Sequence, residues 1–318
     1  MSHERIDLRL DTGPLQSGHA WRLALTVHVP SSHAVVDAPV LVCFPGGRYN
    51  RRYFDLRESG YSEAEHHVSH GVVVIAIDHV RVGESDMPDL QEASLSAAAE
   101  ANHAVLQVAL QRLRNGTLRP GLRPISPSVI VGEGQSMGGH IALLMQAKHR
   151  SFDGLAMLGS SVSCTRLPAR ARADDICLLG RNDPSEGLAK FAHFDWRYAF
   201  HWDDVPEQYA STEVPGPAGT PIPYWRSDTS PNAGGGLIPG HFAAEAAQIT
   251  VPVLLAMGER DVTQDTLREV AAFMSTPDLA YFVVPRMAHM HNFAGTRHRL
   301  WARLSAFIAQ VASQRKYA

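Results

Sequence analysis

Short apolar segments alternate with longer amphipathic segments along most of the chain. The segment 24–29 alternates apolar and polar positions, which is typical of an edge strand with one exposed face. Six further segments are continuously apolar, as strands buried on both faces of a sheet are: 40–44, 72–77, 128–131, 155–158, 251–257 and 280–284. With helical segments between them, they predict an α/β fold whose mostly parallel sheet has seven or eight strands and carries helices on both faces.

Four stretches have the pattern of helices. The segment 62–65, Ser-Glu-Ala-Glu, has the spacing of a capping box and predicts a helix that ends near residue 71. The segment 95–113 is rich in Ala, Leu, Val and Gln, and a third helix is expected directly after Ser136. A helix at the C-terminus would have one apolar face, suited to packing on the sheet, made by Leu300, Trp301, Leu304, Phe307 and Ile308.

The segment 163–248 interrupts this alternation. It is rich in aromatic residues and then in Pro and Gly, the latter at 215–219 and 234–236. An aromatic, loop-rich insert between two strands predicts a lid rather than part of the central core. We therefore predict a core domain formed by 1–162 and 249–318 and a cap, 163–248, inserted after the sixth strand. The aromatic cluster comprises Phe191, Phe194, Trp196, Tyr198, Phe200, Trp202, Tyr209 and Trp225.

Composition narrows the classes of partner. Of 318 residues, 45% are hydrophobic and 19% are charged, so the chain can bury a large core. Its net charge is -3 and it has no block of Lys and Arg, so neither nucleic acid nor a membrane surface is expected as a partner. The N-terminus lacks the pattern of a signal peptide, which predicts a cytoplasmic protein. The expected partner is a small-molecule substrate, and the oligomeric state is left open.

The pentapeptide 134–138, Gly-Gln-Ser-Met-Gly, lies between an apolar strand and a predicted helix. In that context the pattern GxSxG predicts a strained turn that lifts the serine hydroxyl above the sheet. The flanking glycines allow strand and helix to pass close to each other. We therefore predict that Ser136 is a nucleophile. The alternative is that Ser136 only caps the helix.

A serine nucleophile needs a histidine base and an acid that orients the histidine. When the serine lies in a GxSxG turn, both residues are expected later in the chain than the serine. The strand 251–257 leads into Asp261, and the strand that ends at 284 leads into His289. Both positions lie at the carboxyl ends of parallel strands, where α/β sheets gather their sites. We predict Asp261 as the acid and His289 as the base.

Two neighbouring residues compete for these roles. His291 could reach the same cleft as His289, and Glu259 could replace Asp261. The pair His289 and His291 also has the residue type of metal ligands, but no third ligand at suitable spacing is evident. We therefore predict no metal site.

A glycine turn follows the strand 40–44 in the sequence Pro45-Gly46-Gly47-Arg48. Without side chains, its backbone N–H groups can approach a substrate carbonyl. We predict that the N–H groups of Gly47 and Met137 form an oxyanion hole. The alternative is that the glycines serve only to reverse the chain.

Together these features resemble the α/β-hydrolase superfamily over essentially the whole chain. The matching pieces are the Pro-Gly-Gly loop after the third strand, 134–138 after the fifth, Asp261 after the seventh and His289 after the eighth. The stretch 78–85 resembles the superfamily's Asp-x-x-Gly-x-Gly-x-Ser stretch after the fourth strand, which implies a structural role for its aspartate.

This sequence departs from the superfamily pattern at three positions. Arg81 replaces the first glycine of the stretch 78–85. Pro45 stands where many members have His, and Arg48 stands where a third glycine is frequent. The last two departures leave open which N–H completes the oxyanion hole.

The resemblance implies a serine hydrolase that forms an acyl-enzyme on Ser136 and needs no cofactor. The leading hypothesis is a carboxylic ester hydrolase, with lactones among its candidate substrates, acting on an apolar or aromatic small molecule. A carbon–carbon bond hydrolase acting on a diketone-like substrate and a non-enzymatic ligand receptor remain alternatives. Candidate substrate contacts are Arg48, Tyr53, Trp196, Trp202 and His291. A packed lid core would explain the aromatic residues of the lid equally well. Residues such as Arg48 and Tyr53, which follow the glycine turn, are more often solvated.

Overall fold

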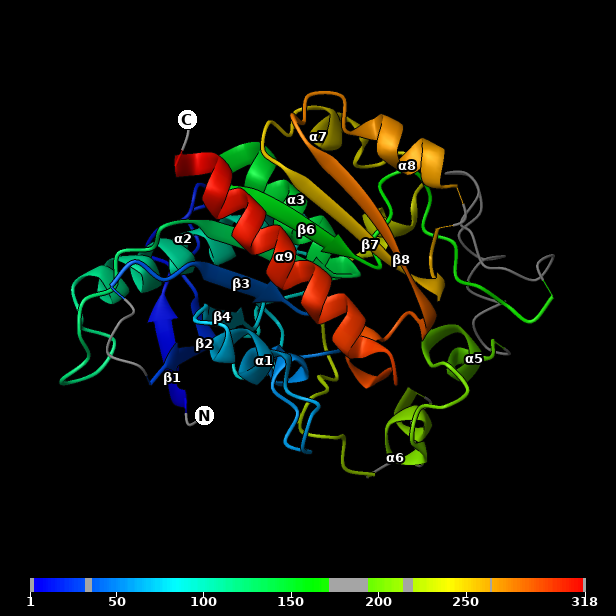
Figure 1. Cartoon of the computed structure of the whole chain (residues 1–318), viewed down its shortest axis with the longest axis horizontal. Coiled ribbons are helices and arrows are strands. Elements are labelled where there is room, and N and C mark those ends of the chain that lie inside the picture. Colours follow the sequence, from blue (N-terminus) through cyan, green and yellow to red (C-terminus); the bar gives the residue numbers. More distant parts are fainter. Residues whose placement is uncertain (1–2, 32–35, 172–193, 214–219, 264, 317–318) are drawn as a thin grey trace.

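An eight-stranded sheet runs through the centre of the protein in the computed structural model (Figure 1). The structure describes residues 3–31, 36–171, 194–213, 220–263 and 265–316. The strand order is β1-β2-β4-β3-β5-β6-β7-β8; β1 and β2 are antiparallel to their neighbours and the remaining pairs are parallel. The strands are β1 (His3–Asp11), β2 (Arg22–Pro30), β3 (Val40–Phe44), β4 (Val73–Ile77), β5 (Ile130–Gln135), β6 (Gly154–Leu158), β7 (Val253–Arg260) and β8 (Leu279–Ala288).

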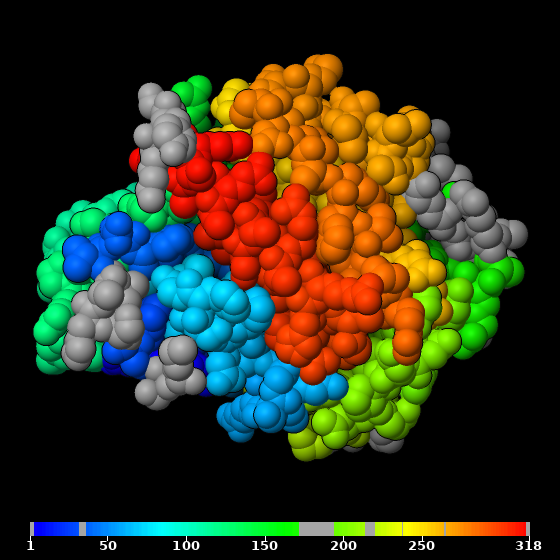
Figure 2. Space-filling model, viewed as in Figure 1, coloured from blue at the N-terminus to red at the C-terminus, as the bar shows by residue number. Residues whose placement is uncertain are grey.

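Helices cover both faces of this sheet, as predicted. On one face lie α1 (Glu63–Ser69) and α9 (Arg297–Lys316), and on the other lie α2 (Leu95–Arg114), α3 (Met137–His149) and the short α7 (Ala243–Ala247) (Figure 1). The buried apolar residues form two main clusters, one beneath each helical layer. Figure 2 views the α9 face, where α9 lies between α1 and the segment that holds β8.

The four predicted helices are confirmed as α1, α2, α3 and α9. At the start of α1, the Ser62 hydroxyl accepts a hydrogen bond from the Glu65 N–H at 3.0 Å, so the predicted capping interaction is present. All five residues of the predicted apolar face of α9 are buried. The apolar spacing along the sequence therefore identifies which helix faces contact the sheet.

The prediction that 24–29 is an edge strand is wrong. These residues belong to β2, which lies between β1 and β4, and β1 is the edge. The polar positions that suggested an exposed face are buried but have partners. The Thr26 hydroxyl accepts from Nε of Arg51 at 2.9 Å, and the rings of His28 and His3 approach to 3.2 Å. Paired polar side chains under a helix thus imitate the sequence pattern of an exposed face.

The opposite edge also differs from expectation. The continuous apolar pattern of 280–284 predicts burial on both faces, but the segment lies in β8, the other edge of the sheet, and Val283 is 46% exposed. In contrast, β5 continues to Gln135, beyond the predicted 128–131. Its last residues, Gly-Glu-Gly-Gln, are not apolar, yet they pair with β3 and β6 on either side. Pairing with β3 and β6 therefore extends β5 as far as Gln135, the residue before Ser136.

Besides α7, the described residues between β6 and β7 contain four short helical elements that lie beyond the sheet. They are α5 (Trp196–Phe200), α6 (Glu207–Ala210), η3 (Ser211–Glu213) and η4 (Gly234–Leu237). In Figure 1, α5 and α6 lie past the carboxyl ends of β7 and β8. The boundaries of the cap, 163–248, stay a prediction. Phe191 and the Pro/Gly stretch 215–219 lie outside the described residues.

Among the helices that the structure describes, none combines the length and the apolar character that a bilayer crossing requires.

Candidate active site

Ser136 lies at the turn between β5 and α3, with φ 53° and ψ -121°. A serine with positive φ is strained, and strain of this kind is typical of functional turns. The turn depends on its glycines. A Cβ on Gly138 would lie 2.1 Å from the carbonyl oxygen of Phe44, and one on Gly134 would lie 2.3 Å from the backbone of Gly138. The glycines are thus required because strand and helix approach each other too closely for side chains.

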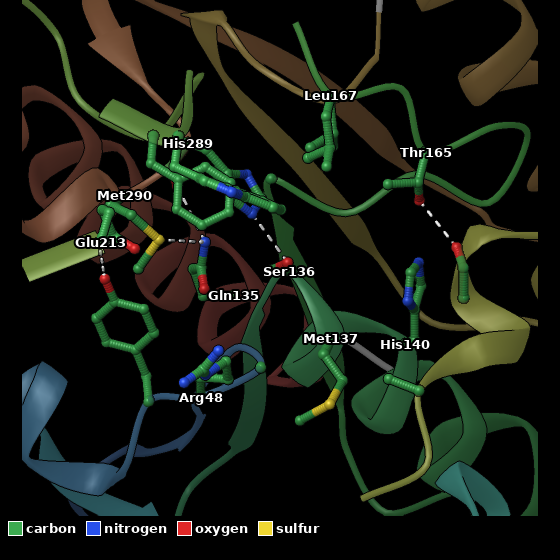
Figure 3. Close-up of a pocket in the computed structure, with 18 of the residues that line it drawn as sticks. Arg48, Gln135, Ser136, Met137, His140, Thr165, Leu167, Glu213, His289 and Met290 are labelled. Atoms are coloured by element: carbon green, nitrogen blue, oxygen red, sulfur yellow. Dashed lines mark hydrogen bonds between the residues drawn. The ribbon is translucent and has the colours of Figure 1, made fainter. Parts of the chain in front are cut away.

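The serine, histidine and aspartate predicted from the sequence lie in hydrogen-bonding order (Figure 3). Oγ of Ser136 is 2.9 Å from Nε2 of His289, and Nδ1 of His289 is 2.7 Å from Oδ1 of Asp261. Because an ionised carboxylate only accepts hydrogen bonds, Nδ1 of His289 carries the proton and donates it. In the neutral imidazole, Nε2 is then an acceptor for the hydroxyl of Ser136.

Four donors surround the carboxylate of Asp261. Oδ1 accepts from His289 and from the N–H of Val262 at 2.8 Å, and Oδ2 accepts from the N–H of Gly258 at 2.8 Å and from Nε2 of His291 at 2.7 Å. Burial alone would raise the pKa of Asp261, but the hydrogen bonds and charges of the two histidines outweigh burial and hold that pKa well below its usual range. Asp261 is therefore ionised at neutral pH.

The two competing residues lie in different places. His291 contacts the second oxygen of Asp261, so it supports the aspartate rather than the serine. Glu259 is exposed and accepts from the N–H of Arg286 at 2.9 Å. No group of three or more side chains able to hold a metal ion occurs among the residues that the structure describes.

The glycine turn after β3 packs directly against the serine turn. A Cβ on Gly46 would lie 2.2 Å from Oε1 of Gln135 and 3.2 Å from Cβ of Ser136. Behind the turn, Nε2 of the buried His79 is 3.0 Å from the carbonyl oxygen of Pro45. Burial lowers the pKa of His79 to about 4, so the ring is neutral and this contact is an N–H donating to a carbonyl. His79 thereby sets the orientation of the first peptide of the turn.

A cavity of about 530 Å³ opens beside Ser136. Gly47 and Met137, the predicted oxyanion pair, line it together with Ser136 and His289. Several apolar side chains form one part of its lining: Leu167, Trp196, Phe200 and Val262.

The predicted substrate contacts divide between the cavity and its surroundings. Arg48 and Trp196 line the cavity, whereas Tyr53, Trp202 and His291 are not among its described lining residues. Tyr53 is buried, and its hydroxyl accepts from the N–H of Asn292 at 3.0 Å. The Trp202 ring contacts the guanidinium of Arg260, whose centre lies 4.7 Å from the ring centroid.

Comparison with known proteins identifies the fold of this chain. No protein-family model matches the sequence, and no curated protein matches it. Solved structures do match. A thermophilic esterase from Thermogutta terrifontis covers 96% of this chain and 99% of its own, with 17% identity and a TM-score of 0.62. A proline iminopeptidase from Mycobacterium smegmatis covers 98% and 99%, with 17% identity and a TM-score of 0.59.

The chain has the α/β-hydrolase fold. A third structure with this fold, an N-acyl homoserine lactonase, covers 96% of this chain and 97% of its own, with 16% identity and a TM-score of 0.53. By their names, the three proteins act on different classes of substrate. The α/β-hydrolase fold therefore does not decide the substrate, which has to be argued from the site.

Sequence reasoning missed several residues that line the cavity of this α/β-hydrolase fold. His140 is one; it follows Ser136 by four positions on α3, so helical spacing could have indicated it. Its Nε2 is 2.9 Å from the carbonyl oxygen of Ser161, and burial lowers its pKa to about 4. The others, Tyr49, Glu213 and Arg226, have no local motif, because distant segments bring them together.

Proposed function

We propose that this protein is a serine hydrolase that cleaves a carboxylic ester, lactones included, through an acyl-enzyme on Ser136. The observation that carries the proposal is the connected series of hydrogen bonds from Ser136 through His289 to Asp261, which begins at a strained turn beside a cavity. A strained serine in contact with a histidine that an ionised aspartate holds is the arrangement that nucleophilic catalysis requires.

The reaction would begin with attack of Ser136 Oγ on the substrate carbonyl carbon. Nε2 of His289 takes the hydroxyl proton as the new C–O bond forms. Asp261 remains ionised, keeps the proton of the neutral ring on Nδ1 and stabilises the imidazolium that results. The imidazolium then returns its proton from Nε2 to the leaving alkoxide when the original ester bond breaks.

Hydrolysis of the acyl-enzyme would repeat these steps with water. His289 removes a proton from a water molecule that attacks the acyl carbon, and Ser136 leaves with that proton. In both steps the negative oxygen would be stabilised by the N–H groups of Gly47 and Met137. The loss of one such donor typically costs about 3 to 4 kcal/mol in transition-state stabilisation.

The apolar lining of the cavity supports an apolar or aromatic group in the substrate. Trp196 and Phe200 are in edge contact, with ring centroids 5.3 Å apart, and the Phe200 ring lies 4.9 Å from that of His289. A substrate group bound against these rings would be next to the reacting atoms. The esterase and the lactonase among the structures of the same fold agree with an ester or lactone substrate.

The test is covalent labelling with a fluorophosphonate followed by peptide mapping. We expect one adduct, on Ser136, that disappears in Ser136→Ala and is strongly reduced in His289→Ala. Ser126→Ala, at an exposed serine, is the matched control and should label like the native protein. An adduct on another residue, or none, would refute the mechanism.

The ester preference needs a second experiment. Aryl esters, lactones and ring-cleavage diketones are assayed with the native protein and with Ser136→Ala. We expect aryl ester or lactone turnover that depends on Ser136. Turnover of diketones without any ester or lactone cleavage would contradict the proposed ester substrate.

A further inference from the structure

One side of the cavity is polar, in contrast to the apolar side formed by Trp196 and Phe200. We call it the polar wall and define it as Arg48, Tyr49, Glu213 and Arg226, all of which line the cavity. A cavity with apolar lining on one side and fixed charges on the other selects ligands that carry both kinds of group.

The polar wall forms where residues 225–227 of the inserted segment pair with the chain that follows the glycine turn. The N–H of Asn50 donates to the carbonyl of Trp225 at 3.0 Å, and the N–H of Ser227 donates to the carbonyl of Arg48 at 2.9 Å. The Asn50 amide nitrogen also donates to the carbonyl of Arg226 at 2.7 Å. These bonds fix Arg226 beside the predicted oxyanion turn, so the wall is a built feature of the site.

Glu213 is fully engaged within the polar wall. One of its oxygens accepts from the Tyr49 hydroxyl and from Nε2 of His201 at 3.0 Å, and the other accepts from Nη1 of Arg226 at 2.8 Å. Burial alone would raise the pKa of Glu213, but these partners lower it, so the carboxylate is ionised. Its negative charge is matched by one arginine of the wall.

Arg226 keeps unused donors in this arrangement. Its residue is 9% exposed, and among the described residues its guanidinium donates only through Nη1, to Glu213 and to the Tyr49 hydroxyl. A guanidinium has five N–H donors, so Nε and Nη2 remain for a ligand. Neither atom is among the fully buried polar atoms that lack a partner, so both are accessible to solvent or to a ligand.

Arg48 adds a second cation beside the serine (Figure 3). It is exposed, and its side chain makes no hydrogen bond or ion pair with the described residues. Its backbone has φ 64°, a conformation that glycine adopts without strain and arginine does not. Its position in the cavity lining leaves its guanidinium available to a ligand.

The two arginines exceed the charge of Glu213 by one positive unit. Among the titratable groups that face the wall, His140 is neutral because burial lowers its pKa to about 4. The carboxylate of Asp261 accepts from His289 and His291 and is not among the described residues that line the cavity. Within the described lining, Arg48, Arg226 and Glu213 together leave one net positive charge, with free N–H donors, open to a ligand.

We infer that the polar wall binds a carboxylate of the substrate, so that the enzyme acts on esters or lactones that also carry a carboxylate. This inference rests on the proposed function. Half esters of dicarboxylic acids are the simplest members of the class. Guanidinium groups suit this role because their planar N–H donors match the two oxygens of a carboxylate.

The kinetic test compares substrates that differ only in the distal charge. The 4-nitrophenyl half esters of succinate, glutarate and adipate are each assayed beside the corresponding 4-nitrophenyl methyl diester, with spontaneous hydrolysis subtracted. For at least one chain length, we expect kcat/KM to favour the acid over its methyl ester by about tenfold or more, since hydrogen bonds to charged groups have this strength. A smaller preference at all three lengths overturns the inference.

Variants of the two arginines test whether the polar wall causes the preference for the acid over its methyl ester. In Arg48→Gln and in Arg226→Gln, the ratio of kcat/KM for acid over methyl ester should fall by about tenfold. Arg299→Gln removes the same charge from an exposed position on α9 and should leave the ratio unchanged. If Arg226→Gln does not fold because Glu213 loses one of its partners, the ratio measured for Arg48→Gln decides whether the inference holds. A ratio that stays at the native value in Arg48→Gln overturns the inference.

A binding experiment separates this inference from the proposed function. Calorimetry with Ser136→Ala measures binding of methyl hydrogen adipate against dimethyl adipate without any turnover. Tighter binding of the acid that Arg48→Gln abolishes supports the polar wall even if Ser136 takes no fluorophosphonate. Equal binding of acid and diester, together with labelling of Ser136, rejects the polar wall and leaves the serine hydrolase intact.

Discussion

His291 donates from Nε2 to Oδ2 of Asp261 at 2.7 Å, while His289 holds the other oxygen at the same distance. Both rings are buried. Nδ1 of His291 is also buried and has no hydrogen-bond partner among the described residues. The contact with Oδ2 indicates that His291 positions the aspartate and does not contact the serine.

The first prediction concerns this positioning residue. His291→Ala removes one charge-assisted hydrogen bond from Asp261, so kcat should fall by about tenfold while KM changes little. His291→Gln can donate from its side-chain amide and should recover part of kcat. Native kcat in His291→Ala would contradict this role.

The second prediction separates the two histidines. His289→Ala removes the proposed base, so kcat for an aryl ester should fall by about 10³-fold or more. That loss should exceed the loss in His291→Ala by a wide margin. His70→Ala, at an exposed position that follows α1, is the control and should behave like the native protein. Equal losses at 289 and 291 would mean that the assignment of the base is wrong.

The third prediction concerns the contact between the two turns. Gly46→Ala places a Cβ 2.2 Å from Oε1 of Gln135, whose Nε2 donates to the carbonyl of His289 at 3.0 Å. Gln135 would have to move and release His289, so kcat should fall by about tenfold or more.

Gly47→Ala provides the comparison for folding. There the nearest atom to the new Cβ is Sδ of Met137 at 3.9 Å, which is an ordinary contact. The thermal midpoint of Gly47→Ala should therefore stay closer to the native value than that of Gly46→Ala. Native kcat in Gly46→Ala would show that the two turns do not constrain each other.

The fourth prediction concerns stability against pH. Glu133 is completely buried in β5, and burial together with the negative charge of Glu63 raises its pKa well above the usual value. A raised folded-state pKa stabilises the fold fully below the unfolded pKa of about 4.3, and that stability is lost as pH rises toward the folded value. Above this unfolded pKa, the free energy of unfolding should fall by up to about 1.4 kcal/mol per pH unit from this group.

Glu133→Gln removes the titration and keeps the shape of the side chain. Denaturant unfolding between pH 5 and 8 should therefore show a smaller loss of stability in Glu133→Gln than in the native protein. Glu65→Gln, at an exposed position on α1, serves as the control and should keep the native slope. A Glu133→Gln variant with the native pH dependence would show that Glu133 is not protonated in the fold.

Prediction from the sequence was most accurate where a local pattern reflects a physical need of one element, such as a buried face or a capped helix start. Apolar spacing identified α9 and its buried face, and the segment 62–65 identified the start of α1. It was weakest at the sheet edges. Thr26 and His28 appear exposed in the sequence pattern because the partners that satisfy them, Arg51 and His3, lie in other segments.

The polar wall could not have been predicted from local patterns. Arg48 and Arg226 are separated by more than half of the chain. They line the same cavity only because backbone hydrogen bonds join residues 48–50 to residues 225–227. The role of His291 is similar. Its proximity to His289 in the sequence made it a rival base, but the distance to Oδ2 of Asp261 assigns it to the aspartate.

The sequence by itself determined the fold class and the chemical identity of the three groups in contact. Strand, turn and helix patterns are local, and the carboxyl ends of parallel strands share one edge, so Ser136, Asp261 and His289 had to lie near each other. Tertiary structure alone decided which atoms of these groups meet, which histidine contacts the serine, and that two distant arginines share one cavity. Those outcomes depend on distances of a few ångströms between segments far apart in the chain, which no pattern of neighbouring residues encodes.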